Sequence, residues 1–262
     1  MSGHGPAMAV AAPLADLLRA PGEGLERQYA HGEVVEVLGR EGAHLNVRAA
    51  RDGLRGWMIG ADLRPMGAPA THAVRPRSSH LYPAPDLKAA PSGWLPFGAR
   101  VAVGRVFTPE ARADGGGRPP AFAHTPMGWV PMAHLRGLDA PEDDPVAVAR
   151  RFLATPYLWG GDGPLGLDCS GLVQAAYLAC GRACPADSGP QRAAFGGPLR
   201  DLAALEPGAL IFWAGHVAMA TGDGRMIHAN AHHMAVAEED AASGAARIAA
   251  SGSPVLAVSR AP

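Results

Sequence analysis

Two similar stretches in the first half of the chain constrain its fold most. Residues 56–63 (GWMIGADL) and 128–135 (GWVPMAHL) share a Gly-Trp pair, four further residues, a polar residue and Leu. Upstream of each lie a Pro-containing stretch (LLRAPG, HLYPAPD) and a β-rich run (HGEVVEVLGR, FGARVAVGRV). Such a repeat, with Gly and Pro turns between short runs, indicates two small β-barrels in tandem. We expect the first barrel over residues 1–68 and the second over residues 69–140.

Apolar runs inside these repeats have the length of strands. Residues 34–38 and 101–103 alternate or bunch apolar side chains, and neither run is long enough for a helix. Gly, Pro and Arg are frequent between residues 108 and 127, which predicts a long surface loop inserted in the second barrel. The pattern resembles bacterial SH3-like modules.

Composition excludes several function classes. The formal net charge of the 262 residues is -1, and no basic stripe could neutralise a run of phosphates, so we expect no nucleic-acid partner. The first 20 residues lack the basic start of a signal peptide, and no apolar segment approaches the length of a membrane span. We therefore expect no membrane insertion and a cytoplasmic location. We also expect a monomer.

The cysteines Cys169, Cys180 and Cys184 are too few and too clustered for a disulfide framework, which agrees with a reducing compartment. We interpret Cys180 and Cys184 as an apolar residue at a helix end and a loop thiol, rather than as a metal pair.

A helix is predicted where the last domain begins. Asp144 and Pro145 match a helix cap followed by Pro in the first turn, and VAVARRFLA at residues 146–154 continues the pattern up to Pro156. A Gly-rich loop, TPYLWGGDGPLGLD, then leads to the most informative residues.

Cys169 follows that loop. Apolar side chains recur at helical spacing over residues 172–180, so Cys169 should lie in the first turn of a buried helix. The unpaired N–H groups and the positive dipole end there favour a thiolate, which is a ready nucleophile. A cysteine at a helix start is by itself more often a packing residue, so the prediction depends on its partners.

Two histidines lie on predicted neighbouring strands. ALIFW, HVAMAT and RMIHA read as strands, and Gly-Asp-Gly at 222–224 forms a hairpin turn between the last two. If these three residues form the loop, Thr221 faces Arg225, and His216 and His228 project from one face about 7 Å apart. One imidazole would then take the thiol proton while the other fixes its tautomer. A two-residue loop would send the histidines to opposite faces.

A metal site was the alternative for the histidines. His228, His232 and His233 could be ligands, but no carboxylate or cysteine stands at matching spacing, so we expect no metal.

With these residues assembled, the stretch from about residue 146 to the end resembles the NlpC-type (NlpC/p-sixty) cysteine peptidases, papain-like enzymes that act on peptidoglycan stem peptides. The resemblance rests on YLWGG at 157–161, DCSGLV at 168–173, GHV at 215–217 and IHA at 227–229. It implies an α+β fold: a papain-like catalytic domain over residues 141–262, preceded by the two SH3-like barrels. No metal or organic cofactor is implied.

The resemblance also implies residue roles. Cys169 would be the nucleophile, His216 its base and His228 the residue that holds this base. The oxyanion of the tetrahedral intermediate would be held by the Cys169 backbone N–H and the Tyr157 hydroxyl.

Substrate-binding roles follow from the same resemblance. Asp168 would pair with the substrate's free ammonium, Ser170 and Ser188 would hydrogen-bond its carboxylate or main chain, and Trp159 would lie at the substrate. A buried carboxylate is costly unless a cation meets it, so Asp168 could select substrates with an exposed amine. Asp168 could equally be a helix cap, and one residue can do both.

Tandem SH3-like barrels before such a domain are similar to the γ-D-glutamyl-L-diamino acid endopeptidases, also described as dipeptidyl-peptidase VI. These cut between γ-linked D-Glu and diaminopimelate or Lys in peptides with a free N-terminal L-Ala, as in cytoplasmic recycling of wall fragments. The implied partners are peptidoglycan-derived peptides.

The chain departs from the family pattern at three positions. Ala209 replaces the usual Asp before the core strand, Ala186 replaces a common Arg, and Leu54 replaces an aromatic thought to line the amine pocket. With Leu54 there, either Glu26 or Glu33 could contribute to amine recognition.

Two other functions fit the same residues. A cysteine amidase acting on another amino-acid or lipid conjugate would be favoured by an apolar cleft without a carboxylate near Cys169. A non-catalytic wall-binding adaptor is the other, and intact Cys169, His216 and His228 argue against it.

Overall fold

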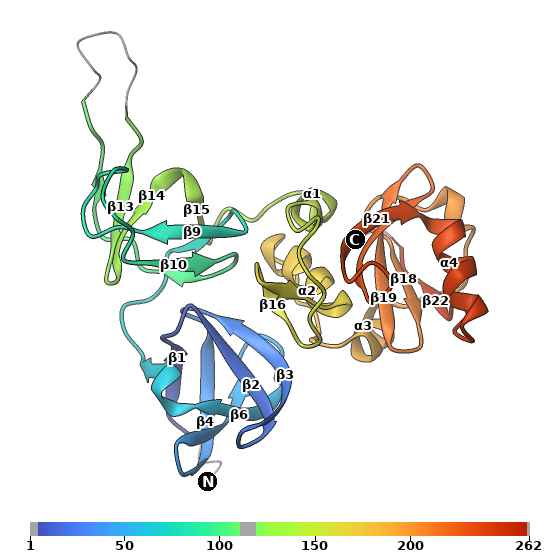
Figure 1. Cartoon of the computed structure of the whole chain (residues 1–262), viewed down its shortest axis with the longest axis horizontal. Coiled ribbons are helices and arrows are strands. Elements are labelled where there is room, and N and C mark those ends of the chain that lie inside the picture. Colours follow the sequence, from blue (N-terminus) through green and yellow to red (C-terminus); the bar gives the residue numbers. More distant parts are fainter. Residues whose placement is uncertain (1–4, 111–118, 261–262) are drawn as a thin grey trace. The chain divides into compact units, whose positions relative to one another are not determined.

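A computed structural model of the chain describes residues 5–110 and 119–260. It divides into two compact units, Met1–Pro141 and Glu142–Pro262. The first unit contains β-strands and short 3-10 turns, whereas the second combines helices with a sheet (Figure 1). Within the described residues, no helix combines the length and the apolarity needed to cross a membrane.

The first barrel is a seven-stranded antiparallel sheet in the order β3-β2-β6-β5-β4-β1-β7. In its core, Leu17, Tyr29, Val47 and Met58 have no exposed surface. The strands are β1 (Ala7–Val10), β2 (Leu14–Ala20), β3 (Glu23–Ala30), β4 (Val34–Glu41), β5 (His44–Ala49), β6 (Arg55–Ile59) and β7 (Leu63–Pro65).

The second β module is built from small antiparallel sheets, β10-β9, β11-β8-β15 and β12-β13-β14. Leu81, Leu95, Val101 and Val130 are buried in its core. The strands are β8 (His72–Val74), β9 (Ser78–Leu81), β10 (Gly93–Pro96), β11 (Arg100–Val101), β12 (Val106–Phe107), β13 (Phe122–Thr125), β14 (Gly128–Pro131) and β15 (Leu135–Gly137).

The sequence repeat corresponds to a repeated local structure. Strand β6 carries the first Gly-Trp pair and leads through the 3-10 turn η1 (Gly60–Asp62) into β7. Strand β14 carries the second pair and leads through η2 (Met132–His134) into β15. In both copies the conserved spacing places a Leu, Leu63 or Leu135, at the start of the short strand, where it is buried.

The loop expected over residues 108–127 is wrong in its second half. Residues 122–125 form β13, and Phe122 is only 2% exposed because it packs inside the module. Residues 111–118 lie outside the described part of the chain.

The second unit begins with α1 (Pro145–Arg150). Asp144 caps it as expected, since its carboxylate accepts from the N–H groups of Val146 (2.8 Å) and Ala147 (3.1 Å). The helix ends earlier than expected, because the following N–H groups bond to carbonyls three residues back and Ala154 then takes a positive φ of 64°.

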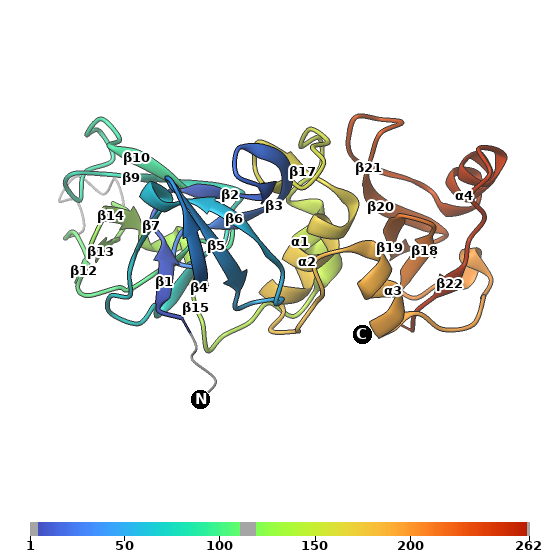
Figure 2. The ribbon, with the colours of Figure 1, turned by 90° about the horizontal axis from the view of Figure 1, so that it is seen from below.

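A five-stranded antiparallel sheet, β21-β20-β19-β18-β22, forms the body of this unit. Helix α2 packs against β19 and β20, and α4 packs against β20 and β21 (Figures 1 and 2). The elements are β16 (Asp162–Gly163), β17 (Gly166–Leu167), α2 (Cys169–Ala179), α3 (Ser188–Phe195), η3 (Leu202–Ala204), β18 (Leu210–Trp213), β19 (His216–Gly222), β20 (Arg225–Asn230), β21 (Ala235–Asp240), α4 (Ala241–Ala250) and β22 (Ala257–Val258).

The hairpin between β19 and β20 differs from the expected one in its turn. Gly222, not Thr221, pairs with Arg225, so the turn has two residues, 223–224. Both turn residues have positive φ, 52° and 70°, as a type I′ hairpin turn requires. The pairing shifts by one residue between Ala220 and Gly222, which leaves Thr221 as a bulge.

This bulge determines on which face of the sheet the side chains of His216 and His228 lie. A two-residue turn alone would place His216 and His228 on opposite faces, and the extra residue at Thr221 reverses that parity. Beyond the bulge Met219 pairs with Ile227, the register that the three-residue loop also predicted. The two histidines therefore lie on one face, as expected, although the expected turn was wrong.

Candidate active site

Cys169 is the first residue of α2 and is 7% exposed. Asp168 caps this helix, because its Oδ1 accepts from the Gly171 N–H at 2.6 Å. In general, the unpaired N–H groups and the positive dipole end at a helix start favour a thiolate there. The helix predicted around Cys169 is confirmed, with Cys180 as its C-cap and Cys184 buried in the following loop.

Asp168 also ties the preceding Gly-rich loop to the helix. Its Oδ2 accepts from the Gly160 N–H at 3.0 Å, and its Oδ1 accepts from the Ser170 hydroxyl at 3.0 Å. Asp168 and Ser170 are both buried. These hydrogen bonds hold the Gly-rich loop against the start of α2, whether or not a substrate also contacts the two side chains.

His216 and His228 form a hydrogen-bonded pair. His216 Nε2 lies 2.8 Å from His228 Nδ1, and the ring centroids are 5.1 Å apart. His228 has no exposed surface, and the Trp213 ring lies 5.4 Å from that of His216. Trp213, His216 and His228 belong to β18, β19 and β20, and the hairpin between β19 and β20 fixes the register of the two histidines.

Glu239 extends this pair, and the sequence did not point to it. Its Oε1 lies 2.7 Å from His228 Nε2, and the Arg247 guanidinium donates to the same oxygen. Glu239 pairs with Met226 across β20 and β21, so it is a diagonal neighbour of His228 on one sheet face. Arg247 reaches it from α4.

The pKa values of both histidines fall well below the ordinary imidazole value. Burial, followed by the neighbouring His228 and Arg247, lowers the pKa of His216 to about 3, although Glu239 and Asp168 act in the opposite direction. Burial, followed by Arg247, His233 and His232, lowers the pKa of His228 to about 3. The effect of Asp168 on His216 links the start of α2 electrostatically to the histidine pair.

A pH dependence follows from these shifts. A base with a lowered pKa stays neutral as the pH falls, and it is lost only when the pH passes below its own pKa. We therefore expect kcat/KM to hold through the ordinary imidazole range, at about pH 5 to 6.5, and to fall only in more acidic solution. Initial rates measured from neutral pH downward check this. An acid limb centred at the ordinary imidazole pKa would contradict it.

The sequence argument against a metal, that no carboxylate accompanies the histidines, is wrong. Glu239, six residues after His233, does join the histidines, since the ligand atoms of His228, His233 and Glu239 all lie within 4.8 Å of one another. Arg247 bonds to Glu239, however, and its positive charge opposes a cation at this place.

Other residues expected at the site are distributed as follows. Tyr157 forms a β-bridge with Leu167, close in sequence to Cys169. Trp159 is 67% exposed, and Ser188 begins α3. In the first barrel, Leu54 packs against the core.

The two acidic candidates of the first barrel differ in their surroundings. The carboxylate of Glu33 is buried, accepts from the Ala30 N–H at 2.8 Å and binds Arg51 through both oxygens at 2.9 and 3.0 Å. Glu26 is more exposed and lies 3.7 Å from Arg19. Glu33 is therefore held within the barrel, whereas Glu26 lies at its surface.

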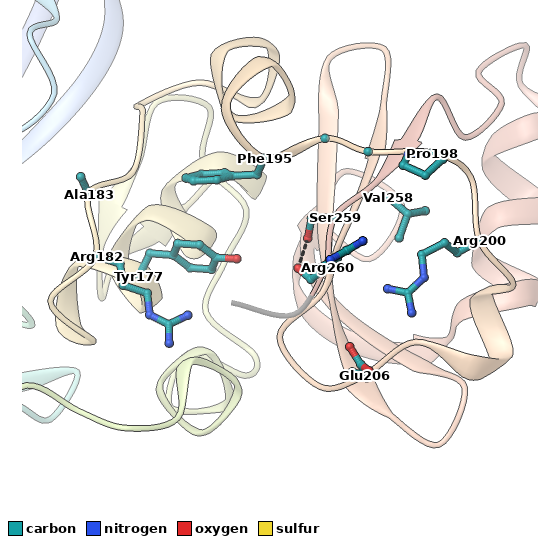
Figure 3. A pocket seen from close by; sticks show the side chains of 12 residues that line it. Tyr177, Arg182, Ala183, Phe195, Pro198, Arg200, Glu206, Val258, Ser259 and Arg260 are labelled. Carbon is teal, nitrogen blue, oxygen red and sulfur yellow. Dashed lines mark hydrogen bonds between the residues drawn. The ribbon is translucent and has the colours of Figure 1, made fainter.

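A pocket of about 1090 Å³ opens elsewhere in the same unit, toward the other end of α2 (Figure 3). Tyr177, Phe195, Arg182, Arg200 and Arg260 line it. Its lining includes neither Cys169 nor the histidine pair, so this pocket is separate from the candidate active site.

Comparison with known proteins agrees with this architecture. The model of the NlpC/P60 family matches residues 154–248, and that of the bacterial dipeptidyl-peptidase SH3 domain matches residues 17–63. A gamma-D-glutamyl-L-lysine dipeptidyl-peptidase of Bacillus cereus is 42% identical over 94 residues, covering 33% of this chain and 28% of the relative. Dipeptidyl-peptidase 6 of Lysinibacillus sphaericus is 40% identical over 87 residues, covering 32% and 31%.

The chain spans about a third of the length of these curated relatives. Among solved structures, an NlpC/P60 family protein from Bacillus cereus superposes with a TM-score of 0.70 at 22% identity, covering 89% of this chain and 94% of that chain. This likeness shows a shared fold. Residues 154–248 therefore form an NlpC/P60 domain, and a bacterial SH3-like domain lies ahead of it at residues 17–63.

Proposed function

We propose that the protein is a cysteine peptidase that hydrolyses the γ-D-glutamyl-diamino acid bond of peptidoglycan stem peptides. Cys169 is the nucleophile, His216 the base and His228 the residue that orients the base. The observation that carries this proposal is the buried, hydrogen-bonded His216–His228 pair on strands against which the helix of Cys169 packs. A nucleophile, a base and an orienting group are the parts that acyl transfer needs.

The reaction divides into acylation and deacylation. The Cys169 thiol gives its proton to His216 as the sulfur attacks the γ-carbonyl carbon, and the Cys169 N–H and the Tyr157 hydroxyl stabilise the oxyanion. Collapse breaks the C–N bond, and the departing amine takes the proton from His216. Water then attacks the thioester, gives its proton to His216 and releases the γ-carboxyl product, after which the thiol regains its proton.

The substrate class is supported by the relatives, two of which are named for dipeptidyl-peptidase activity. We propose that the substrate carries a free N-terminal L-Ala, whose ammonium meets Asp168, and that Ser170, Ser188 and Trp159 contact the rest of the peptide. The Asp168 carboxylate is already bonded by neighbouring N–H groups, so an ammonium would add a cation to an acceptor set that is partly used. Cytoplasmic recycling of wall peptides by a monomer is the corresponding biological role.

One pair of substrates tests this proposal. L-Ala-γ-D-Glu-diaminopimelate should be cleaved between D-Glu and diaminopimelate, and its N-acetylated form should be cleaved at least about 100-fold more slowly, because it leaves the buried acceptor without a cation. Product formation is followed by mass spectrometry with reduced protein. Equal cleavage of both would overturn amine selection, and cleavage of neither would overturn the peptidase assignment.

A further inference from the structure

We infer that Glu239 and Arg247 are positioning residues that fix the protons on both histidines, so that Nδ1 of His216 is the atom that accepts the Cys169 proton. This inference rests on the proposed function and deepens it, since that function does not say which imidazole nitrogen is the base. It concerns residues that no sequence motif indicated.

The Glu239 carboxylate fixes the proton on the His228 ring. An ionised carboxylate offers only acceptors, and a neutral imidazole has one donor nitrogen and one acceptor nitrogen. Glu239 Oε1 lies 2.7 Å from His228 Nε2, so this nitrogen carries the proton. Nδ1 of His228 is therefore the acceptor of that ring.

His228 in turn fixes the proton on the His216 ring. His228 Nδ1 lies 2.8 Å from His216 Nε2, so His216 Nε2 must be the donor. The remaining nitrogen of His216, Nδ1, then holds a lone pair. Burial keeps the pKa of His216 low, which leaves this lone pair free at neutral pH.

Because of Arg247, the proton positions on both histidines depend on the Glu239 carboxylate. Its guanidinium has only donors and bonds to the same oxygen of Glu239 that His228 uses. Without the carboxylate, a donor would face His228 Nε2, and that nitrogen would become the acceptor. The protons would then reverse along the pair, and His216 Nδ1 would carry a hydrogen that blocks it as a base.

The alternative is that Glu239 and Arg247 only fasten α4 to the sheet. The neighbouring Glu238 offers a matched comparison, because it points to the other face of β21 and binds Arg150 of α1 at 2.9 Å through a comparable ion pair. Glu238 also accepts from the Thr221 hydroxyl at 2.8 Å but contacts neither histidine by a hydrogen bond. A purely structural role would give similar results for both carboxylates.

Graded variants separate the two roles. In Glu239→Met the acceptor is lost, and we expect kcat to fall about 100-fold with KM nearly unchanged, because an orienting group acts on the base and not on substrate binding. Glu239→Gln keeps an acceptor oxygen and should recover most of this loss. Glu238→Met should stay within a few fold of the wild type.

The proton positions can be read directly by nitrogen-15 NMR of the histidine rings. In the wild type at neutral pH, both His216 and His228 should be protonated at Nε2. In Glu239→Met both should move toward the Nδ1-protonated form, and in Glu238→Met both should stay as in the wild type. This measurement needs folded protein but no turnover, so it remains decisive even for a protein that does not cleave the proposed peptide.

Arg247→Met provides a second variant with a distinct signature. His228 is faced by Arg247, His232 and His233 besides its partners, and Arg247, Glu239 and Asp168 act on His216. Loss of the cation Arg247 should move the acid limb of kcat/KM to higher pH, whereas loss of the anion Glu239 should move it to lower pH.

Three results would overturn the inference: equal losses in Glu239→Met and Glu238→Met, a tautomer pattern unchanged in Glu239→Met, or acid limbs that do not shift in opposite directions. A wild-type protein that shows the expected tautomers but cleaves neither peptide would instead refute the proposed function and leave the proton arrangement standing.

Discussion

Replacing Cys169 by alanine is expected to reduce peptide cleavage by about 10⁵-fold or more. The reason is chemical: alanine can form no thioester, and the other residues of the site cannot replace the nucleophile. Release of diaminopimelate from L-Ala-γ-D-Glu-diaminopimelate, with enzyme in excess, is the measurement. The substitution removes one sulfur from a nearly buried position, so the thermal unfolding temperature should change little compared with the activity.

Cys180→Ala is the matched control. Cys180 is the C-cap residue of the same helix and is only half-buried, so its loss tests for general effects of removing a thiol from α2. It should retain nearly full activity. Comparable loss in both variants, or turnover remaining in Cys169→Ala, would contradict the nucleophile assignment.

His216→Ala should lower kcat/KM by about 10⁴-fold, because the variant has no group to take the thiol proton and return it to the leaving amine. Discontinuous assays over long incubations with the same peptide measure the residual cleavage rate of this variant as a function of pH. The residual rate should rise with pH as hydroxide and the free thiolate take over. His232→Ala removes an exposed histidine close to the pair and should leave activity within a few fold; a loss as large as that of His216→Ala would contradict the assignment.

The strands and the helix of the candidate site could be predicted because their signals are local. Apolar residues at helical spacing follow Cys169, and Gly-Asp-Gly separates two short apolar runs, so α2, β19 and β20 were found. The bulge at Thr221 was not. It is a shift in the pairing of β19 with β20, and no pattern within either strand encodes such a shift.

Glu239 was missed for a related reason. It stands next to another glutamate in a strand with weak alternation, and only the pairing of β21 with β20 decides which of the two faces His228. The 2-residue period of a strand would have placed Glu238 and Glu239 on opposite faces but could not have said which face holds the histidines. Long-range register, rather than residue type, carries this part of the site.

Other differences also come from tertiary structure. The end of α1 came earlier than the sequence pattern suggested because its last turn tightens into bonds between residues three apart. Strand β13 was hidden within a stretch rich in Gly and Pro, and it forms because Phe122 and Ala123 are buried inside the second module. The composition of a loop-like stretch does not indicate that Phe122 and Ala123 within it are buried.

The central claim is that His216 makes the Cys169 thiol reactive, and the rate of Cys169 alkylation by iodoacetamide tests it most directly. An ordinary thiol, with a pKa of about 8.5, is mostly protonated and slow to react at neutral pH. The account predicts that His216 takes the proton as the sulfur attacks, so Cys169 of the wild type is alkylated rapidly at neutral pH, whereas in His216→Ala the rate is slower and rises only toward the ordinary thiol pKa. Identical pH profiles for the two proteins would contradict it.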